Sequence, residues 1–342
     1  MELHVNTYGS YVHVRDNMFE IRRRVDNGEI EKKQFSSQKV THLLLTTGTS
    51  LSTDAIKLAM RNNIDIVFIE QDGEPIGRVW HSKFGSTTRI RKAQLEASMS
   101  RQGVRYVKSW LLSKIDNQID FIKDLKKHRS QHADYLNDKL ARLESLRSSL
   151  SALEAERVSE IAEVIRGLEG TAGRLYFETL SHVLPRSYQF DGRSSRPAQD
   201  AFNAFLNYAY GILYSIVEKC LIIAGIDPYL GFLHRDDYNL LSMVYDFIEP
   251  YRIYAEEVVF RLFSGKKVNQ THTINLSATV GKPGVSLSPE GKALLIGEFS
   301  EFMNNKPIRF RGRNLCRSHC VQLEAHGFAN DLVGKSKGSE SS

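Results

Sequence analysis

Three short segments of the chain hold side chains that suit chemistry on a charged substrate. Glu169 lies in RGLEGTAGRLYF, residues 166–177, where small neighbours let another chain or helix approach closely. His234 ends the segment GFLH, while Asp246 and Glu249 stand three residues apart in YDFIEPYR. On one helix, an i,i+3 pair of carboxylates faces the same way. Each segment alone is more typical of salt-bridged acids or a structural histidine, so only their combination indicates a site.

A second candidate site is the pair Cys316 and Cys320, with His319 and His326 nearby. Three intervening residues lie within the usual spacing of zinc-binding cysteines. A second full pair is missing, so two reduced cysteines near a basic tail are the preferred interpretation and zinc is the alternative. The whole chain has three cysteines, too few for a disulfide framework.

Basic residues gather in two parts of the chain. The formal net charge of the 342 residues is only +6, with a pI of about 9.0. Residues 78–129 nevertheless hold 13 Lys and Arg against 4 Asp and Glu, and residues 306–317 hold five Lys and Arg with no acid. Such clustering is expected of a protein with a polyanionic partner, and the plain alternative is a solvated helix face.

Composition and motifs exclude several classes of protein. Hydrophobic residues make up 41% and charged residues 25%, which argues against wholesale disorder and collagen-like repeats. The chain has no G-x-G-x-x-G, G-x-x-x-x-G-K-[ST] or G-x-S-x-G motif, so a nucleotide-binding fold or an esterase has no support. The N-terminus lacks a signal-peptide pattern, and the longest apolar stretch, residues 221–226, is far shorter than the ~20 residues of a membrane helix. We therefore expect a soluble cytoplasmic protein without membrane contact.

Residues 1–85 are predicted to form a β-rich domain. Apolar or alternating runs flank the turn-like triplet Arg15–Asn17, and Asn27-Gly28 is a strong hairpin signal. Ser52 is suited to cap a short helix that runs to Met60. Strands are predicted at residues 11–14, 18–21, 40–46 and 64–69, with a last strand that ends at Trp80.

Residues 86–330 are predicted to form a second, helical domain, followed by a disordered polar tail at 331–342. Leucines from Leu136 to Leu153 recur at steps of three and four, which indicates a long amphipathic helix or a helical hairpin. The further predictions are an apolar helix over residues 201–224, a turn at 227–231, a helix over 239–263, a loop with a short hairpin over 264–289, and a helix capped by Ser288 that runs to Met303.

In this order, the segments resemble one family: the CRISPR-associated spacer-acquisition integrases, the universal subunit of CRISPR adaptation, also described as metal-dependent DNA endonucleases. The resemblance extends over most of the chain, and residues 224–234, AGIDPYLGFLH, are its most specific stretch. The other matching segments are residues 66–73, 91–94, 114–118, 168–177, 193–197 and 200–208.

The resemblance implies an α+β, mainly helical protein, in which an N-terminal β-sandwich-like dimerisation domain precedes a larger all-α catalytic domain. It also implies that Glu169, His234 and Glu249 are the catalytic residues and metal ligands, with Asp246 in a supporting position. Carboxylate oxygens suit Mg²⁺ or Mn²⁺, and an imidazole ligand favours Mn²⁺ without excluding Mg²⁺. Two carboxylates would offset the charge of the ion.

The implied reaction inserts short DNA fragments, as new spacers, into a repeat array by metal-dependent transesterification. The nucleophile would be a DNA 3′-hydroxyl in integration and water in hydrolysis, while the metal polarises the scissile phosphate. Tyr176 is a candidate helper beside Glu169, with a core position as the alternative. The candidate contacts to DNA phosphates are Arg174, Arg193, Arg196 and Arg252.

The implied partners are a double-stranded DNA fragment, the repeat array, a second copy of the chain, and a smaller ferredoxin-like subunit that bridges two dimers in the prokaryotic cytoplasm. Two alternatives are weighed against this function. A non-catalytic nucleic-acid-binding scaffold of an adaptation complex would bind DNA without chemistry at Glu169, His234 and Glu249. A helical interaction protein built on the leucine seam would show no salt-dependent DNA binding.

Overall fold

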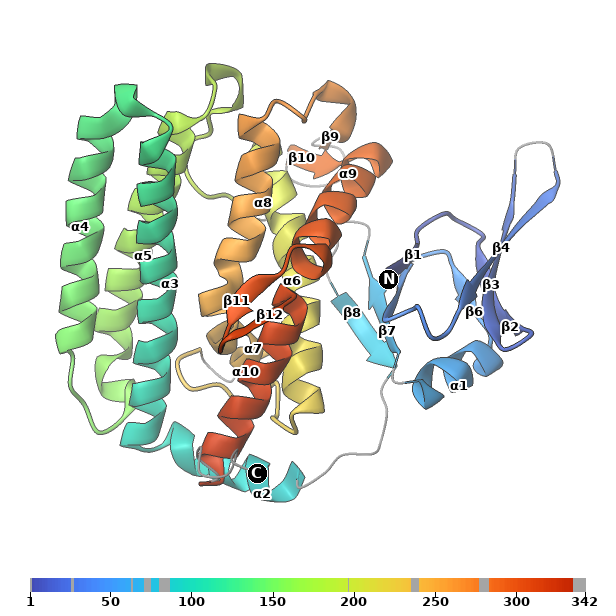
Figure 1. Cartoon of the computed structure of the whole chain (residues 1–342), viewed down its shortest axis with the longest axis horizontal. Coiled ribbons are helices and arrows are strands. Elements are labelled where there is room, and N and C mark those ends of the chain that lie inside the picture. The colour runs from blue at the N-terminus through green and yellow to red at the C-terminus, as the bar shows by residue number, and fades with distance from the viewer. Residues whose placement is uncertain are drawn as a thin grey trace. The chain divides into compact units, whose positions relative to one another are not determined.

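The computed structural model describes residues 2–25, 28–62, 64–70, 75–79, 87–195, 197–234, 240–276 and 283–334. Internal contacts divide the chain into two compact units, Met1–Phe84 and Gly85–Ser342 (Figure 1). In the residues that the structure describes, the first unit holds two β-sheets and one helix, and the second is largely helical. The predicted order, a β-rich domain followed by a helical domain, is confirmed.

The N-terminal unit consists of two four-stranded sheets that share one core. Apolar side chains of both sheets, Val12 and Phe19 from one and Leu43 and Ile66 from the other, pack into that core together with α1. The first sheet has the order β1 (Glu2–Val5), β5 (His42–Thr46), β7 (Asp65–Ile69), β8 (Pro75–Val79). The second has the order β4 (Ile30–Ser36), β3 (Met18–Arg24), β2 (Tyr11–Arg15), β6 (Ser50–Leu51).

Local sequence signals explain the turns and the helix of this unit. Asp16 and Asn17 both have positive φ angles, 53° and 59°, which suits the tight turn between β2 and β3. The side chain of Ser52 accepts a hydrogen bond from the backbone of Ala55 and caps α1 (Thr53–Arg61), as predicted. The predicted strand ending at Trp80 is present as β8, although Trp80 itself lies outside the described residues, as does Asn27.

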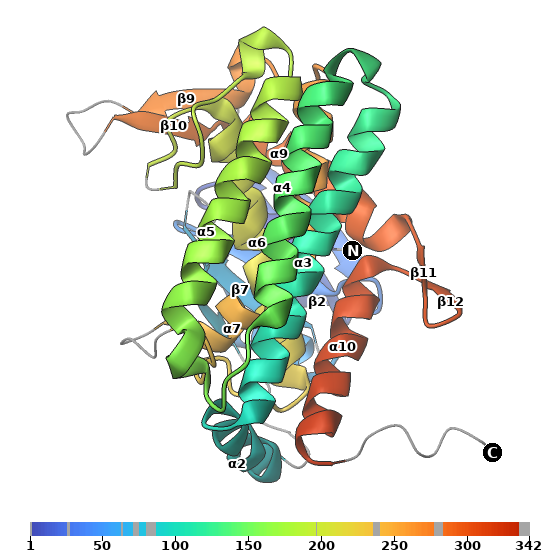
Figure 2. The same ribbon diagram turned by 90° about the vertical axis from the view of Figure 1, so that its left-hand side faces the viewer.

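The helical unit begins with long helices that pack side by side. Figure 2 shows α3, α4 and α5 as one layer of near-parallel helix axes, with α6 behind them. The helices are α2 (Thr87–Ser98), α3 (Arg101–Lys127), α4 (Ala133–Ala152), α5 (Val158–Val183), α6 (Ala201–Ile223), α7 (Ser242–Phe247), α8 (Arg252–Ser264), α9 (Pro289–Ser300) and α10 (Arg317–Leu332). Two short hairpins are β9 (Thr273–Leu276) with β10 (Gly284–Leu287), and β11 (Ile308–Phe310) with β12 (Arg313–Leu315).

The leucine seam belongs to a helical hairpin, one of the two predicted forms. Leu136, Leu140, Leu143 and Leu150 are buried on α4, and the chain turns back into α5 after residue 153. The seam packs against α3 and α5. Its function is therefore structural, because it attaches the helix that carries Glu169 to its neighbours.

Helix α6 is the apolar centre of the helical unit. It is long and apolar enough to cross a membrane by length and composition alone, but 72% of its apolar window is buried inside the protein. It packs against α7, α8, α9 and α10. Burial on several sides is what makes a core helix apolar all round.

The helix predicted over residues 239–263 is divided into two. Helix α7 ends at Phe247, a 3₁₀ turn spans Glu249–Tyr251, and α8 starts at Arg252. Pro250 explains the division, because it has no N–H group to continue the helical hydrogen bonds and its ring crowds the preceding turn. Asp246 and Glu249 consequently belong to different elements, so the expected i,i+3 pair on one helix is wrong.

The C-terminal end differs from the predicted tail by a few residues. Helix α10 continues to Leu332, whose side chain is buried, whereas the tail was predicted from residue 331. Residues 335–342 lie outside the described residues.

Candidate active site

The ring of His234 is fixed by a buried aspartate. The carboxylate of Asp246 is 2% exposed and accepts hydrogen bonds from the backbone N–H groups of Phe232, Leu233 and His234 at 2.5, 2.9 and 3.2 Å. Its Oδ1 lies 2.6 Å from Nδ1 of His234. Because an ionised carboxylate only accepts, Nδ1 is the donor, and Nε2 remains as the lone-pair nitrogen of the neutral ring. This pattern is the one that commonly orients a metal-binding histidine.

The turn before His234 leaves no room for a side chain at residue 231. A Cβ added to Gly231 would lie 2.6 Å from Cβ of Ser242 and 3.2 Å from Oδ2 of Asp246. The turn is also held by Gln94 of α2, which is fully buried. Its side-chain amide donates to the carbonyls of Asp227 and Leu230, both at 2.9 Å, and its Oε1 accepts from the backbone of Asp227. Gln94 lay in a segment matched from the sequence, but no role was predicted for it.

Glu169 and Glu249 meet at a lysine. The Lys114 ammonium of α3 lies 2.7 Å from Oε1 of Glu169 and 2.6 Å from Oε2 of Glu249. Glu249 is 2% exposed, and its other oxygen accepts from Nε of Arg252 at 2.7 Å. Two carboxylates from α5 and from the turn before α8 thus converge on one positive charge.

The charges of this cluster shift one another's pKa values. Burial alone would raise the pKa of Glu249, but Arg252 and Lys114 outweigh it and lower that pKa to about 2. Burial would lower the pKa of Lys114, but the charges of Glu249 and Glu169 raise it. The pKa of His234 is also raised, because Asp246, Glu249 and Glu169 together outweigh the effect of burial.

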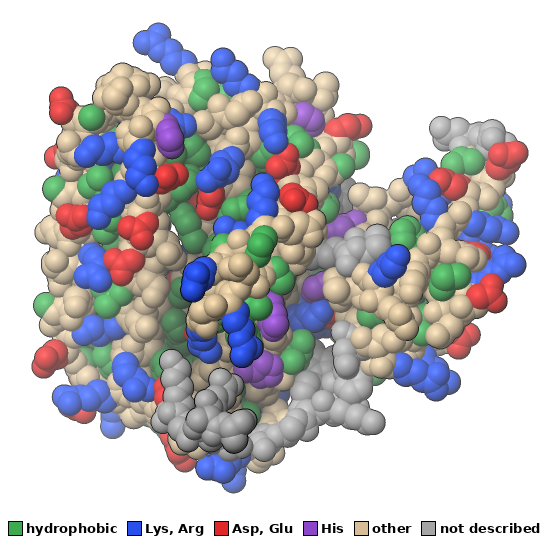
Figure 3. All heavy atoms as spheres, in the orientation of Figure 1, with side chains coloured by type: hydrophobic (Ala, Val, Ile, Leu, Met, Phe, Trp, Pro, Cys, Tyr) green, Lys and Arg blue, Asp and Glu red, His purple; other side chains and the backbone are tan. Residues whose placement is uncertain are grey.

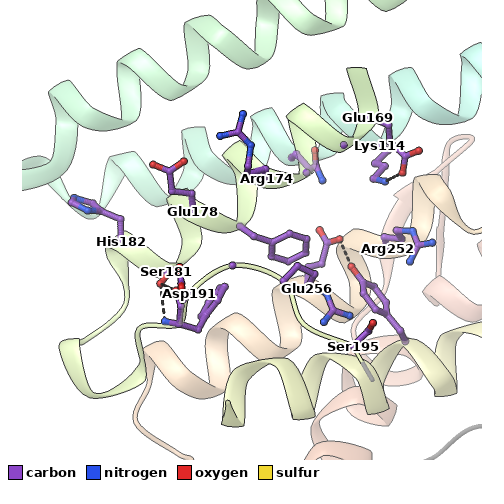
Figure 4. Close-up of a pocket in the computed structure, with 18 of the residues that line it drawn as sticks. Lys114, Glu169, Arg174, Glu178, Ser181, His182, Asp191, Ser195, Arg252 and Glu256 are labelled. Carbon is purple, nitrogen blue, oxygen red and sulfur yellow. Dashed lines mark hydrogen bonds and ion pairs between the residues drawn. The ribbon is translucent and has the colours of Figure 1, made fainter. Parts of the chain in front are cut away.

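A cleft of about 980 Å³ extends from this cluster along α5 (Figure 4). Glu169, Lys114 and Arg252 lie at one end of it, and Ser181 and His182 lie at the other. Its walls are rich in arginine and in aromatic rings. The lining residues on which the site depends are Lys114, Glu169, Arg174, Phe177, Arg193, Tyr210, Tyr214 and Arg252.

Arg193 and Arg252 stack on aromatic rings in the cleft. The guanidinium groups lie 5.4 and 5.0 Å from the ring centre of Tyr210. Arg193 is held further by the side-chain oxygens of Asn203 and Asn207 at 2.8 and 2.6 Å. A flat guanidinium that is already positioned is well suited to bind a phosphate. Arg174 also lines the cleft, whereas Arg196 lies outside the described residues.

Tyr176 is fully buried, in keeping with a core position. Burial, followed by the charge of Glu256, raises its pKa well above the usual value. Glu256 accepts a hydrogen bond from the hydroxyl of Tyr210 at 2.6 Å, and burial raises its pKa. Glu256 and Lys114 are polar residues of the cleft to which sequence reasoning gave no role. Lys114 stood in a matched segment, and Glu256 had no sequence signal.

The predicted metal ligands fall into two groups in the described part of the chain: Glu169 with Glu249 around Lys114, and His234 with Asp246. Within the described residues, no three His, Cys, Asp or Glu side chains converge tightly enough to hold a metal as they stand. Cys316 and Cys320 are free thiols, and Cys320 is buried. Within the part of the chain that the structure describes, Cys316 and Cys320 form no cluster with other side chains that could hold zinc.

Comparison with known proteins identifies the class. Residues 3–301 match the profile of the family described as "CRISPR associated protein Cas1". The chain is 30% identical over 346 residues to "CRISPR-associated endonuclease Cas1 1" of Archaeoglobus fulgidus, covering 98% of this chain and 97% of that one.

Two solved structures share the fold. One is a "Casposase bound to integration product", with a TM-score of 0.81 and 21% identity over 98% of this chain and 92% of the other. The other is a "Cas6-RT-Cas1--Cas2 complex", with a TM-score of 0.77 and 20% identity over 98% of this chain and 35% of the other.

The chain belongs to the Cas1 family of CRISPR-associated proteins. The predicted family is therefore confirmed. The predicted class of activity, an endonuclease that acts in spacer integration, is confirmed together with the family.

Proposed function

We propose that Glu169, His234 and Glu249 bind one Mg²⁺ or Mn²⁺ ion and that this site joins a DNA 3′-hydroxyl to a phosphodiester of a repeat array. The bound ion would polarise the scissile phosphate and offset the charge that develops on its oxygens. In hydrolysis, water would replace the 3′-hydroxyl. Neither reaction needs a nucleophile from the protein.

Two observations carry this proposal: Asp246 pairs with His234, and Glu169 and Glu249 share one cation. The Asp246 hydrogen bond sets the tautomer of His234 and directs the lone pair to Nε2. Glu169 and Glu249 hold the Lys114 ammonium between them at 2.7 and 2.6 Å, so their oxygens fit a positive charge. Two carboxylates and one imidazole also match the ligand preferences of Mn²⁺ and Mg²⁺.

The residues of the cleft have separate functions in the proposal. Arg252 holds Glu249 ionised and oriented through its 2.7 Å hydrogen bond. Arg174 and Arg193, together with Arg196, contact phosphates of the DNA strand. Arg252 lines the cleft and, besides its bond to Glu249, donates from Nη1 to the hydroxyl of Tyr214 at 3.1 Å, so it is a further candidate for a phosphate contact. Tyr176 supports the site only through the buried core around Glu256.

The partners of the chain belong to the same proposal. We expect a homodimer joined through the N-terminal units, and a small ferredoxin-fold subunit that bridges two dimers. The names of two structures that share the fold support partners of this kind. One is a "Cas6-RT-Cas1--Cas2 complex", and the other is a casposase bound to an integration product.

A strand-transfer assay tests the proposal. A labelled duplex with free 3′-hydroxyls and a supercoiled target carrying a repeat are incubated with the chain and the partner subunit, in Mn²⁺, Mg²⁺ or EDTA. We expect metal-dependent joining by the wild type and none by Glu169→Ala or His234→Ala. Both variants should keep salt-sensitive DNA binding, because the arginines of the cleft remain.

Glu163→Ala is the matched control. Glu163 lies on α5, the same helix as Glu169, but its side chain is 81% exposed and pairs with Arg166. This variant should join strands as the wild type does. Joining by His234→Ala would contradict the ligand assignment, and DNA binding by every variant with no joining by the wild type would favour the non-catalytic scaffold.

A further inference from the structure

The basic hairpin β11–β12 lies outside the cleft. No lining residue of the cleft comes from residues 306–317. Figure 2 shows the hairpin standing away from the helices on the side of α10, with α5 on the opposite side of the unit. In Figure 3, Lys and Arg side chains gather around the place that the hairpin occupies in Figure 1. The surface of the hairpin is therefore distinct from the lining of the active-site cleft.

The charges of the hairpin are largely uncompensated. Residues 306–317 contain five basic residues and no acid. Arg311 pairs with Glu324 at 2.9 Å, and Arg317 donates to the backbone carbonyls of Phe302 and Lys306. For Arg309 and Arg313, both exposed, the described residues provide no ion pair or hydrogen bond to the side chain. Exposed arginines without a partner are available to an external anion.

The base of the hairpin is rigidly attached to the helical unit. It follows a π-helical turn, Glu301–Asn305, a rare conformation that often marks functional sites. The Arg317 guanidinium stacks on the ring of Phe302 at 3.7 Å and ties the two ends of the hairpin together. At the tip, Arg311 and Gly312 have positive φ angles of 47° and 79°, as a tight two-residue turn requires. The arginines are thus presented on a preformed ribbon.

We propose that the β11–β12 hairpin binds the phosphate backbone of duplex DNA, at a position outside the active-site cleft. A two-stranded ribbon fits into the major groove of B-DNA, where arginines reach the phosphates on either side. The apolar residues Ile308, Phe310 and Leu315 are half-buried, so the hairpin lacks the exposed apolar anchor on which a protein interface usually depends. The inference rests on the proposed DNA substrate but not on the metal site.

Salt-dependent DNA binding tests the inference. Binding of a labelled duplex is measured by fluorescence anisotropy for the full-length wild type and for Arg309→Ala/Arg313→Ala, between about 50 and 200 mM salt. Loss of two phosphate contacts should reduce the slope of log affinity against log salt by about 1.8. Over this range the wild type should therefore lose about 12-fold more affinity than the variant. Arg309→Lys/Arg313→Lys should restore most of the slope.

A charge-matched control separates local contact from net charge. Lys57→Ala/Arg61→Ala removes two exposed charges from α1 and should leave the slope unchanged. Unaltered melting temperatures would show that all variants fold, as the exposure of these side chains predicts. An unchanged slope in the hairpin variant would overturn the inference. If the hairpin variant kept the wild-type slope but no longer bound a protein subunit, the inference would also be overturned, because the hairpin would then contact a protein.

The two proposals fail in different ways. The wild type could join strands in a metal-dependent reaction while its salt slope for DNA binding equals that of the hairpin variant. That result would support the proposed function and overturn the inference about the hairpin. If the hairpin variant has a reduced salt slope but the wild type joins no strands, the inference about the hairpin would stand and the proposed function would be overturned. A wild type that binds no duplex DNA would overturn both.

Discussion

Asp246 shows how one buried side chain can determine the chemistry of another. Its carboxylate takes four hydrogen bonds, three from the backbone and one from the His234 ring, so neither group can rotate freely. The resemblance had placed Asp246 in a supporting position. In the structure, these four hydrogen bonds all come from residues 232–234, so the carboxylate holds that turn and the His234 ring together.

Replacing Asp246 should weaken metal binding more than it weakens the fold. In Asp246→Asn the amide oxygen can still accept from the backbone, but the charge that holds the imidazole is lost. We expect the affinity for Mn²⁺ to fall about 10–100-fold, as measured by isothermal titration calorimetry. Asp331→Asn is the control, since Asp331 bonds Tyr106 and Arg105 instead. Equal Mn²⁺ affinity in wild type and Asp246→Asn would refute the orienting function.

Lys114 and a divalent ion would compete for the same two carboxylates. In Lys114→Met, Glu169 loses its cation and Glu249 keeps only Arg252, so the metal-free protein should be destabilised by roughly 3 kcal/mol. Mn²⁺ should then raise the melting temperature of the variant more than that of the wild type. The measurement is thermal unfolding in EDTA and in Mn²⁺. Equal shifts in both proteins would show that Lys114 does not occupy the place of the ion.

At the scale of single elements, the places where helices start and end determine where several site residues lie. Pro250 ends α7 early and turns Glu249 towards α3, where Asn117 donates to the Pro250 carbonyl at 2.8 Å. Asp200 caps α6, and Asn203, one turn later and fully buried, holds the loop that carries Arg193. The break at Pro250 is followed by Arg252, and the loop before α6 carries Arg193; both arginines line the cleft.

The second sheet contains a buried carboxylate, Glu20, whose ionisation should make the stability of the fold depend on pH. Glu20 on β3 accepts hydrogen bonds from Gln34, Arg22 and His13, which together outweigh burial and lower its pKa from 4.5 to about 2. A pKa that is lower in the folded state stabilises the fold above about 4.5, and this stabilisation is lost as the pH falls towards about 2.

Glu20→Gln should therefore lower the melting temperature at neutral pH, and the difference from wild type should shrink as the pH falls below about 4.5. Circular dichroism at a series of pH values measures this. Asp16→Asn, at an exposed turn position with a positive φ that asparagine tolerates, is the control and should show little difference. A constant difference at every pH would count against the hydrogen-bonded carboxylate as the cause.

At the scale of the whole molecule, α6 joins the parts of the helical unit into one core. Leu213 on α6 is fully buried, and the helix contacts α7, α8, α9 and α10. Leu213→Ala should cost about 2–5 kcal/mol, because it removes apolar contacts and leaves a cavity. Urea unfolding followed by far-UV circular dichroism measures the loss.

Leu95→Ala provides the comparison. Leu95 on α2 is 47% exposed, so its truncation should change stability by no more than about 0.5 kcal/mol. If both substitutions cost the same, α6 would not have the central structural function assigned to it.

Much of the fold could be predicted because its signals are local. The alternation of β2 and β3, the caps at Ser52 and Ser288 and the leucine steps of α4 each depend on residues within a few positions of one another. The one helix predicted over 239–263 is wrong for a local reason as well, because Pro250 interrupts it.

The sequence by itself determined the family, through segments that keep their residue types and order, and it named Glu169, His234 and Glu249. Only the tertiary structure decided what these side chains meet. Lys114 reaches Glu169 across 55 positions, and Gln94 holds the Asp227 turn across 133. Contacts of this length leave no periodic trace in the sequence, because they depend on how α2, α3 and α5 pack and not on the spacing within any one of them.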